Sequence, residues 1–347
     1  MDILKQALGI DVAKDELVVS LGRMYKDLTI EIYSTNVFSN NQSGFKSLMK
    51  WVNQQTDTAI KIQFVMEATR VYHQKFAYFL DEEGCNVSVV MPNKISNYMR
   101  TLEIKTITDN TCAKAIAQFG LERKLDLWKR PNPVYKKLQQ LTRERDQIVS
   151  ERVAVKNQLH AEKTEAEPHQ NSIKRLNARI VFLNKQEAEI KKDIKIIISK
   201  EETIKKEIEN ICTIPGVGEL TAATILGETN GFELIRNKKQ LVSYAGLDIK
   251  EKQSGISVRG IPKISKKGNR TLRKSLHLPA ITSIKYNQNH RELFARIVSK
   301  NGIKMKGVVA VQRKILELIY TLHKNKTRFE HNYEKREQLQ VTASLTN

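Results

Sequence analysis

The stretch Leu8-Gly-Ile-Asp-Val12 decides the fold of the first part of the chain. It is a short, mostly apolar run, typical of a buried strand, and Asp11 is its charged residue. The next two runs, Leu17–Leu21 and Leu28–Tyr33, alternate like strands. The chain therefore opens with three expected strands that have no helix between them.

Strands and helices alternate through the rest of residues 1–130. Residues 41–52 read as a helix with a polar start, and residues 62–66 as a strand that ends at Glu67. Residues 71–80 read as a second helix, and residues 87–91 as a buried strand. Three early strands followed by this alternation predict an α/β domain, a mixed sheet covered by helices.

Composition points to a polyanionic partner. The chain has 347 residues and a formal net charge of +21, which suits nucleic acid or an acidic membrane surface. No apolar run approaches the ~20 residues that span a bilayer, and the N-terminus lacks the apolar core of a signal peptide. The scattered cysteines, Cys85, Cys112 and Cys212, suggest reduced thiols without zinc-ligand spacing. We expect a cytoplasmic protein.

Residues 131–211 have a heptad pattern. Two long polar helices are expected, separated near Pro168, which would break a helix interior. The second helix carries an apolar seam typical of a coiled coil. Its seam positions are Ile173, Leu176, Ile180, Leu183, Glu187, Ile190, Ile194, Ile197, Glu201, Ile204, Ile208 and Ile211. Either a coiled-coil hairpin within one chain or an additional dimer along the seam fits this pattern.

The remaining chain differs in charge and order. Residues 212–327 read as a helical, strongly basic region, and residues 328–347 as a polar tail that we expect to be flexible. The multidomain expectation is therefore an α/β domain (1–130), a helical hairpin (131–211), a mainly helical domain (212–327) and the tail.

Three acidic residues of the first domain are candidate metal ligands. Asp11 and Glu67 lie at or near strand ends, and Asp109 lies near the start of an expected helix over residues 109–119. Carboxylates in such places can converge on two Mg²⁺ ions, which stabilise the attacking and leaving oxygens of phosphoryl transfer. The alternative for Asp109 is a simple helix cap.

A turn with two glycines, Ile214-Pro-Gly-Val-Gly218, precedes a helical run. Gly216 and Gly218 would let backbone N–H groups approach a phosphate at the helix N-terminus. A Pro-Gly-Val-Gly turn between helices is the pattern of a helix-hairpin-helix, which binds DNA backbone without sequence preference. A tight turn without a ligand is the alternative.

A serine and a dense basic stretch follow. Ser254 stands beside Gly255, and a serine hydroxyl becomes a nucleophile only when its surroundings activate it. Basic side chains crowd the next twenty residues and would neutralise phosphates. They are Arg259, Lys263, Lys266, Lys267, Arg270, Arg273 and Lys274. An ordinary solvated charged face is the alternative.

These pieces occur in the order found in one family. The chain resembles the DEDD transposases of insertion-sequence family one-hundred-and-ten and its sister group eleven-eleven, the bridge-RNA-guided recombinases. The matching stretches are Gly9–Lys14, Met66–His73, Thr108–Ala113, Ile214–Gly218, Gln240–Leu247, Ser254–Gly255 and Ile264–Asn269.

The resemblance implies an RNase H-like (RuvC-like) N-terminal domain, a coiled-coil insertion and a C-terminal transposase domain. It implies that Asp11, Glu67 and Asp109 bind Mg²⁺, with Mn²⁺ as an alternative, and that Ser254 attacks a DNA phosphate to form a phosphoserine linkage. It also implies a noncoding bridge RNA that pairs with donor and target DNA, and homodimers that assemble into tetramers. The setting that it implies is prokaryotic and nucleoid-associated.

Two positions depart from the family pattern. Cys112 stands where the family has a fourth carboxylate, and a soft thiol is a poor ligand for Mg²⁺. Arg70 stands where the family usually has glycine.

The leading hypothesis is an RNA-guided DNA transposase or recombinase with a serine-linked intermediate. The alternatives are a metal-dependent nuclease or junction resolvase that uses water, and a catalytically weakened nucleic-acid-binding protein, which Cys112 favours.

Overall fold

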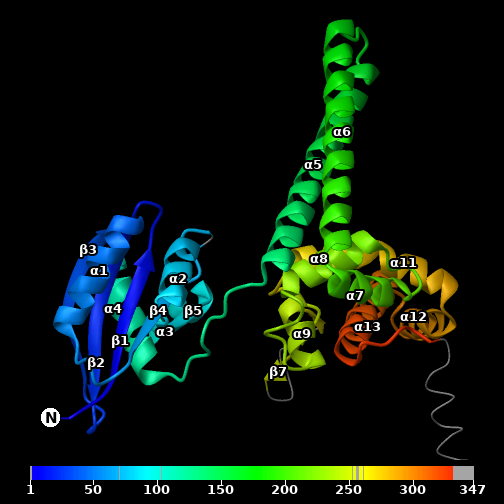
Figure 1. Cartoon of the computed structure of the whole chain (residues 1–347). Helices are drawn as coiled ribbons and strands as arrows, with labels where there is room; N and C mark the ends of the chain where they lie inside the picture. The colour runs from blue at the N-terminus through cyan, green and yellow to red at the C-terminus, as the bar shows by residue number, and fades with distance from the viewer. Residues whose placement is uncertain are drawn as a thin grey trace, which may run out of the picture. The chain divides into compact units, whose positions relative to one another are not determined.

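The computed structural model describes residues 2–330 except residues 70, 103, 252, 255–257 and 261, and gives only the backbone of residues 253, 254, 258, 259 and 301. Arg70, the side chains of Ser254 and Arg259, and the tail beyond residue 330 lie outside the described part. The chain divides into two units, Met1–Arg130 and Pro131–Asn347, which are described separately (Figure 1).

The first unit is built on a five-stranded mixed sheet, which confirms the α/β prediction. The strands are β1 (Ile3–Val12), β2 (Glu16–Tyr25), β3 (Ile30–Ser39), β4 (Ile62–Glu67) and β5 (Asn86–Val90). Their order in the sheet is β3-β2-β1-β4-β5. The first three strands pair antiparallel, whereas β4 lies parallel to both β1 and β5.

Helices cover both faces of this sheet. They are α1 (Gln42–Gln55), α2 (His73–Glu82), α3 (Pro92–Thr101) and α4 (Asp109–Glu122). On one face, Leu8 and Ile10 share an apolar core with phenylalanines of α1 and α2. On the other face, Val65 packs with α3 and α4. Alternate residues of a strand point to opposite faces, so the odd-numbered residues Ala7, Gly9 and Asp11 of β1 face α4.

The second unit begins with a long helical hairpin, α5 (Pro133–Thr164) and α6 (Gln170–Lys200). The two helices pack side by side, and the chain turns between them at the expected break near Pro168. Glu187, at a seam position, is buried and paired with cations from both helices. Those cations are Arg145, Arg152 and Lys191.

The expectation of one second helix running to Ile211 is wrong. Helix α6 ends at Lys200, and α7 (Glu202–Cys212) begins after Glu201, whose backbone is extended (φ −119°, ψ 93°). The break lets Ile204, Ile208 and Ile211 pack into the core of the C-terminal helices.

The remaining elements form a helical region, as the sequence predicts. The helices are α8 (Glu219–Thr229), α9 (Lys238–Ala245), α10 (Arg270–Ser275), α11 (His277–Tyr286), α12 (Gln288–Asn301) and α13 (Lys304–Asn325). Two short strand pairs lie between α9 and α10: β6 (Ile249–Lys250) with β9 (Lys263–Ile264), and β7 (Gln253–Ser254) with β8 (Val258–Arg259). The base of the hairpin shares one apolar core with these helices. Within the described ranges, no helix is long and apolar enough to cross a membrane.

Candidate functional site

Asp11 and Glu67 lie at the carboxyl ends of two neighbouring parallel strands. Ile10 of β1 pairs with Met66 of β4, so the next residue in each strand is one of the two acids. Val65 of β4 touches α4, and Glu67 is two residues further on. Because residues two apart in a strand share a face, both acids are directed to the face that α4 covers.

Gly9 explains how Asp109 comes near them. A Cβ built at Gly9 would lie 2.2 Å from both the Ala113 carbonyl oxygen and the Ala117 amide nitrogen of α4. The backbone of α4 therefore lies directly on β1, which only glycine permits. This contact carries the first turn of α4, with Asp109, towards the end of β1 that holds Asp11.

Asp109 is free of the capping role that was its alternative. Thr108 caps α4, because its hydroxyl accepts a hydrogen bond from the Thr111 amide (3.2 Å) and Thr111 Oγ1 accepts one from the Thr108 amide (2.8 Å). Asp109 follows as the first helical residue and is exposed. Its carboxylate is thus available to an external group.

The charges of Asp109 and Glu67 both act on Asp11. Burial, then the charges of Asp109 and Glu67, raises the pKa of Asp11 to about 6. Burial also raises the pKa of Glu67. Like charges held together in this way are the arrangement that a bound cation would relieve.

Cys112 faces the same group of acids. Burial and then the charges of Asp11, Glu67 and Asp109 raise its pKa to about 11, so the side chain is a neutral thiol near pH 7. Its sulfur lies 4.0 Å from that of Met99. A soft thiol is a poor ligand for Mg²⁺.

The acids fit a divalent cation in chemistry but do not close around one position. Carboxylate oxygens are the donors that Mg²⁺ prefers. In the part of the chain that the structure describes, no three His, Cys, Asp or Glu side chains are placed to hold a metal ion. Side-chain rearrangement would be needed to complete such a site.

The glycine-containing turn connects α7 to α8, and its two glycines differ. Gly216 has a left-handed φ of +90°, and a Cβ there would lie 2.7 Å from the Pro279 carbonyl oxygen of α11. Gly218 is exposed before α8, with no atom within 4 Å of a Cβ built on it. Gly216 therefore serves helix packing, whereas Gly218 leaves the N-terminus of α8 accessible.

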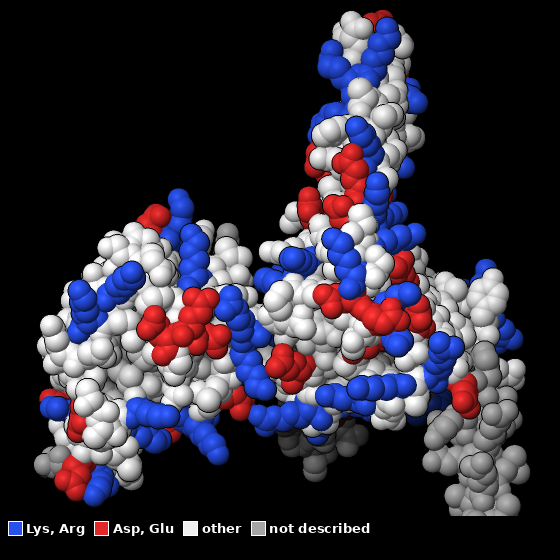
Figure 2. Space-filling view, in the orientation of Figure 1, with Lys and Arg blue, Asp and Glu red and all other residues white. Residues whose placement is uncertain are grey.

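The basic stretch also divides into exposed and structural residues. Lys263, Lys266, Lys267 and Arg270 are exposed. Arg273 is half-buried, and its guanidinium donates to the Ala245 carbonyl (2.8 Å) and the Gly268 carbonyl (3.2 Å). Lys274 pairs with Asp146 of α5 (3.1 Å). Figure 2 shows further Lys and Arg along the hairpin and over the helical region.

Ser254 lies in a different unit from the acids. Its backbone pairs with Val258 in the β7–β8 hairpin, and Gln253 pairs with Arg259. The side chains of Ser254 and Arg259 are outside the described residues.

Sequence reasoning missed a buried ion pair in the second unit. The Glu228 side chain is 0% exposed, and Arg143 donates to its two oxygens at 2.6 and 2.8 Å. The available signal was the carboxylate of Glu228 at the end of the mostly apolar run of α8, where a buried charge needs a partner.

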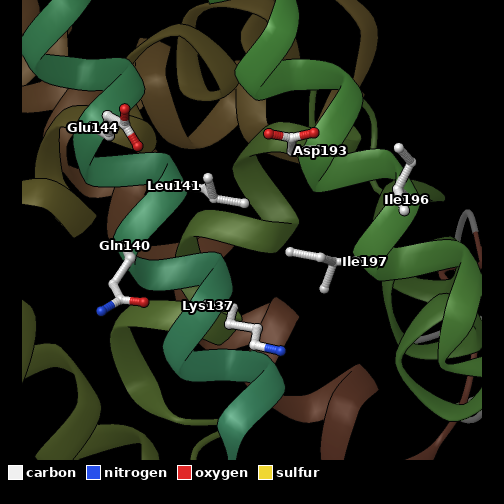
Figure 3. A pocket seen from close by; sticks show the side chains of 7 residues that line it. All are labelled: Lys137, Gln140, Leu141, Glu144, Asp193, Ile196 and Ile197. Atoms are coloured by element: carbon white, nitrogen blue, oxygen red, sulfur yellow. The ribbon is translucent and has the colours of Figure 1, made fainter.

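A hollow of about 560 Å³ lies between α5 and α6, and no predicted site residue is among the residues that line it. Figure 3 shows Leu141 and Ile197 pointing towards each other across it, with Lys137 beside them. Glu144 and Asp193 lie at its edge, and their carboxylates do not converge on a common point. It has no features of an active site.

Comparison with known proteins identifies the class. A model of DEDD transposases of the IS110 type matches residues 8–164, and a model described as transposase of the IS116/IS110/IS902 family matches residues 208–295. The chain is 27% identical over 328 residues to a pilin gene-inverting protein of Moraxella lacunata, covering 94% of this chain and 98% of that protein. It is 26% identical, with the same coverage, to that of Moraxella bovis.

Similarity to solved structures is weak. RuvC of T. thermophilus in complex with a Holliday junction substrate aligns with a TM-score of 0.24 and 10% identity, over 32% of this chain and 90% of that chain. An Aquifex aeolicus member of the Ppx/GppA family aligns with a TM-score of 0.21 and 9% identity, over 99% of this chain and 98% of that one. Scores this low do not assign a fold.

The two matched models are both transposases, so the chain is a DNA transposase or recombinase. More narrowly, it belongs to the IS110 family of transposases, since both models of that family match it in order and span most of its length.

Proposed function

We propose that this transposase cuts and rejoins DNA through a covalent bond to Ser254, assisted by Asp11, Glu67 and Asp109. The observation that carries the proposal is the acidic group itself. Two strand ends and one helix start hold Glu67 and Asp109 close enough for their charges to act on Asp11, on one face of the sheet. Transposases of the matched type are named for such an acidic set.

The chemistry conserves the energy of the broken bond. The Ser254 oxygen attacks a DNA phosphorus, the bond to the 3′ oxygen breaks, and the serine proton passes to a base or water as the 3′ hydroxyl leaves. A 3′ hydroxyl of the exchanged strand then attacks the phosphoserine and releases the serine. A bound Mg²⁺ or Mn²⁺ would supply charge stabilisation at the phosphate. The three carboxylates would hold that cation.

The relatives support rejoining rather than simple cleavage. They are named for inverting a pilin gene. A segment inverted in place needs every cut end rejoined, which a covalent intermediate achieves without a nucleotide cofactor. Inversion or transposition by this chain is therefore the expected outcome, on donor and target DNA.

The finer architecture belongs to the same proposal. The strand order with β2 antiparallel to its neighbours supports an RNase H-like, RuvC-like domain. The α5–α6 hairpin supports a coiled coil that joins protomers into dimers and tetramers, and the α7–α8 turn supports a helix-hairpin-helix. We also propose that Lys263, Lys266, Lys267 and Arg270 bind phosphates. Guidance by a noncoding RNA rests on the family resemblance.

The test is to mix the protein, RNA transcribed from the flanking DNA, and a supercoiled plasmid that carries the element ends, with Mg²⁺. We expect a protein–DNA adduct that survives denaturation and is lost in Ser254→Ala. Ser243→Ala, which alters an exposed serine of α9, is the control and should retain the adduct. Cleavage that persists equally in Ser254→Ala would instead indicate a nuclease or junction resolvase that uses water.

A second candidate is a nucleic-acid-binding protein with weakened catalysis. The thiol of Cys112 beside the acids favours it, because the fourth hard ligand is missing. Full binding without cleavage in Mg²⁺ or Mn²⁺, and cleavage restored by Cys112→Asp, would support this alternative over the first.

A further inference from the structure

The buried carboxylate of Glu228 joins three parts of the second unit. It lies in α8 and accepts two hydrogen bonds from Arg143 of α5. Asn269, which precedes α10, donates its amide to the same carboxylate at 2.6 Å. The backbone carbonyl of Glu228 accepts a bond from the Tyr244 hydroxyl of α9 (3.0 Å). The buried charge is tolerated because Arg143 and Asn269 both donate hydrogen bonds to the carboxylate.

Asn269 connects this carboxylate to the basic turn formed by residues 265–269. Its side-chain oxygen caps α10 by accepting from the Leu272 amide (3.1 Å), while its amide group serves Glu228. Its backbone N–H donates to the Tyr244 carbonyl (2.7 Å). One side chain therefore sets both the start of α10 and the end of the turn.

The turn lies flat against the end of α9. A Cβ at Gly268 would lie 2.5 Å from the Gly246 nitrogen and the Tyr244 carbonyl oxygen, so no larger residue fits there. The Lys266 amide donates to the Gly246 carbonyl (3.1 Å), and Lys266 has a left-handed φ of +52°. Such a backbone is unfavourable for lysine and needs the surrounding contacts to hold it.

The conformation held in this way exposes two adjacent cations. Lys266 and Lys267 are both exposed, and among the described side chains neither forms an ion pair. By contrast, Arg273 donates to backbone carbonyl groups, and Lys274 pairs with Asp146. The unpaired charges of the turn are thus available to a polyanion.

We propose that Glu228 is a positioning residue for nucleic-acid binding. Through Asn269 it holds the turn so that Lys266 and Lys267 both reach the phosphate backbone of the bound strand. This rests on the proposed function, in which the exposed lysines bind phosphates. Arg143 orients the Glu228 carboxylate through its two hydrogen bonds, so the base of the hairpin is part of the same support.

The test uses a substitution that leaves charge unchanged. In Asn269→Ser, the serine oxygen still caps α10, but the amide donor to Glu228 is removed. Affinity for a labelled random-sequence DNA duplex of about 30 base pairs is measured over a range of salt concentrations without divalent cations. Each phosphate that the protein neutralises contributes about 0.9 to the slope of log K against log salt, so two fewer phosphates lower it by about 1.8.

We expect Asn269→Ser to reduce the slope of log K against log salt by about 0.9 to 1.8, which corresponds to one to two phosphates. At about 0.15 M salt, binding should weaken about five-fold for each phosphate that is no longer neutralised. Arg143→Lys, which keeps the charge but removes the two-pronged bond, should act in the same direction. Asn237→Ser is the matched control, because Asn237 caps α9 through the Gln240 amide and does not serve Glu228. It should leave the slope unchanged. Thermal melting establishes that each variant is folded.

A double-mutant cycle separates this inference from the proposed function. Lys266→Gln with Lys267→Gln should flatten the slope by about 1.8, and adding Asn269→Ser should then change nothing further. If the lysine variant binds as wild type does, the proposed phosphate-binding role of the turn is wrong. If the lysine variant has the flatter slope but folded Asn269→Ser and Arg143→Lys keep the full slope, the positioning role of Glu228 is refuted. An equal effect of Asn269→Ser with and without the lysines refutes it as well.

Discussion

Replacing Gly9 by alanine should damage both the stability of the first unit and its acidic site. The added Cβ would lie 2.2 Å from backbone atoms of α4, whereas ordinary contact begins at 3.4 Å. Helix α4 must therefore retreat by about 1.2 Å, the difference between these two distances. Because backbone rather than a flexible side chain is in the way, we expect the upper part of the usual overpacking cost, about 2–3 kcal/mol.

The two tryptophans of the chain, Trp51 and Trp128, both lie in the first unit, so their fluorescence reports its unfolding in the full-length protein. With a urea m-value of about 2 kcal/mol/M, Gly9→Ala should lower the unfolding midpoint by about 1 M. The same displacement moves Asp109 relative to Asp11. Misplacement by about 1 Å costs on the order of 100-fold in rate, so adduct formation in a single turnover should slow by about that factor.

Gly22→Ala provides a graded control in the same sheet. Its Cβ would meet the end of the Ile32 side chain at 2.6 Å, and that group can move aside. The urea unfolding midpoint of Gly22→Ala should shift by less than half of the shift in Gly9→Ala. An unchanged midpoint in Gly9→Ala, or equal shifts in the two variants, would show that α4 does not lie on β1 as described.

Three further predictions concern charge. Cys112→Asp should lower the Mg²⁺ concentration that gives half-maximal adduct formation, because a hard oxygen replaces a neutral thiol; an unchanged or higher requirement contradicts this. The Mg²⁺-induced rise in melting temperature should fade as pH drops through about 6, since Asp11 takes up a proton there, and Asp11→Asn should abolish that dependence. Without a cation, the pH dependence has the opposite sign. The folded state binds the Asp11 proton more tightly than the unfolded chain does, so the contribution of Asp11 to the free energy of unfolding decreases as pH rises from 3.8 to about 6. Glu187→Gln leaves three cations around a buried position without their carboxylate, so it should lower the free energy of unfolding by about 3–5 kcal/mol, measured by circular dichroism. A decrease below about 1 kcal/mol would show that the cluster is solvated.

The break in the seam shows where sequence periodicity misleads. An apolar repeat continues through residues 173–211, so a single helix was the natural prediction. The helix nevertheless ends at Lys200. Periodicity indicates which residues become buried, but it does not indicate what they pack against. Ile204, Ile208 and Ile211 pack into the core of the C-terminal helices instead of continuing the seam of the hairpin. Glu201 lies at the break, but Glu187 is also a charge at a seam position and lies inside α6, so a seam charge does not by itself locate the end of the helix.

The basic stretch shows the same limit for side chains. Composition alone treats Arg273 and Lys266 as equivalent cations. The fold uses Arg273 to hold two carbonyl groups and leaves Lys266 exposed on a left-handed turn. Nothing local distinguishes them, because the carbonyl partners come from a different helix and from the turn that packs against it.

The sequence by itself determined the elements and their chemistry: the strand that contains Asp11, the strand that ends at Glu67, the helix that starts near Asp109, and the break near Pro168. Each of these depends on local periodicity and on residues with strong local preferences. Only the tertiary structure decided which groups meet. The contact of α4 with Gly9, the pairing of Glu228 with Arg143 and Asn269, and the packing of Gly216 on α11 join residues far apart in the chain, and their energies depend on burial that no single segment can specify.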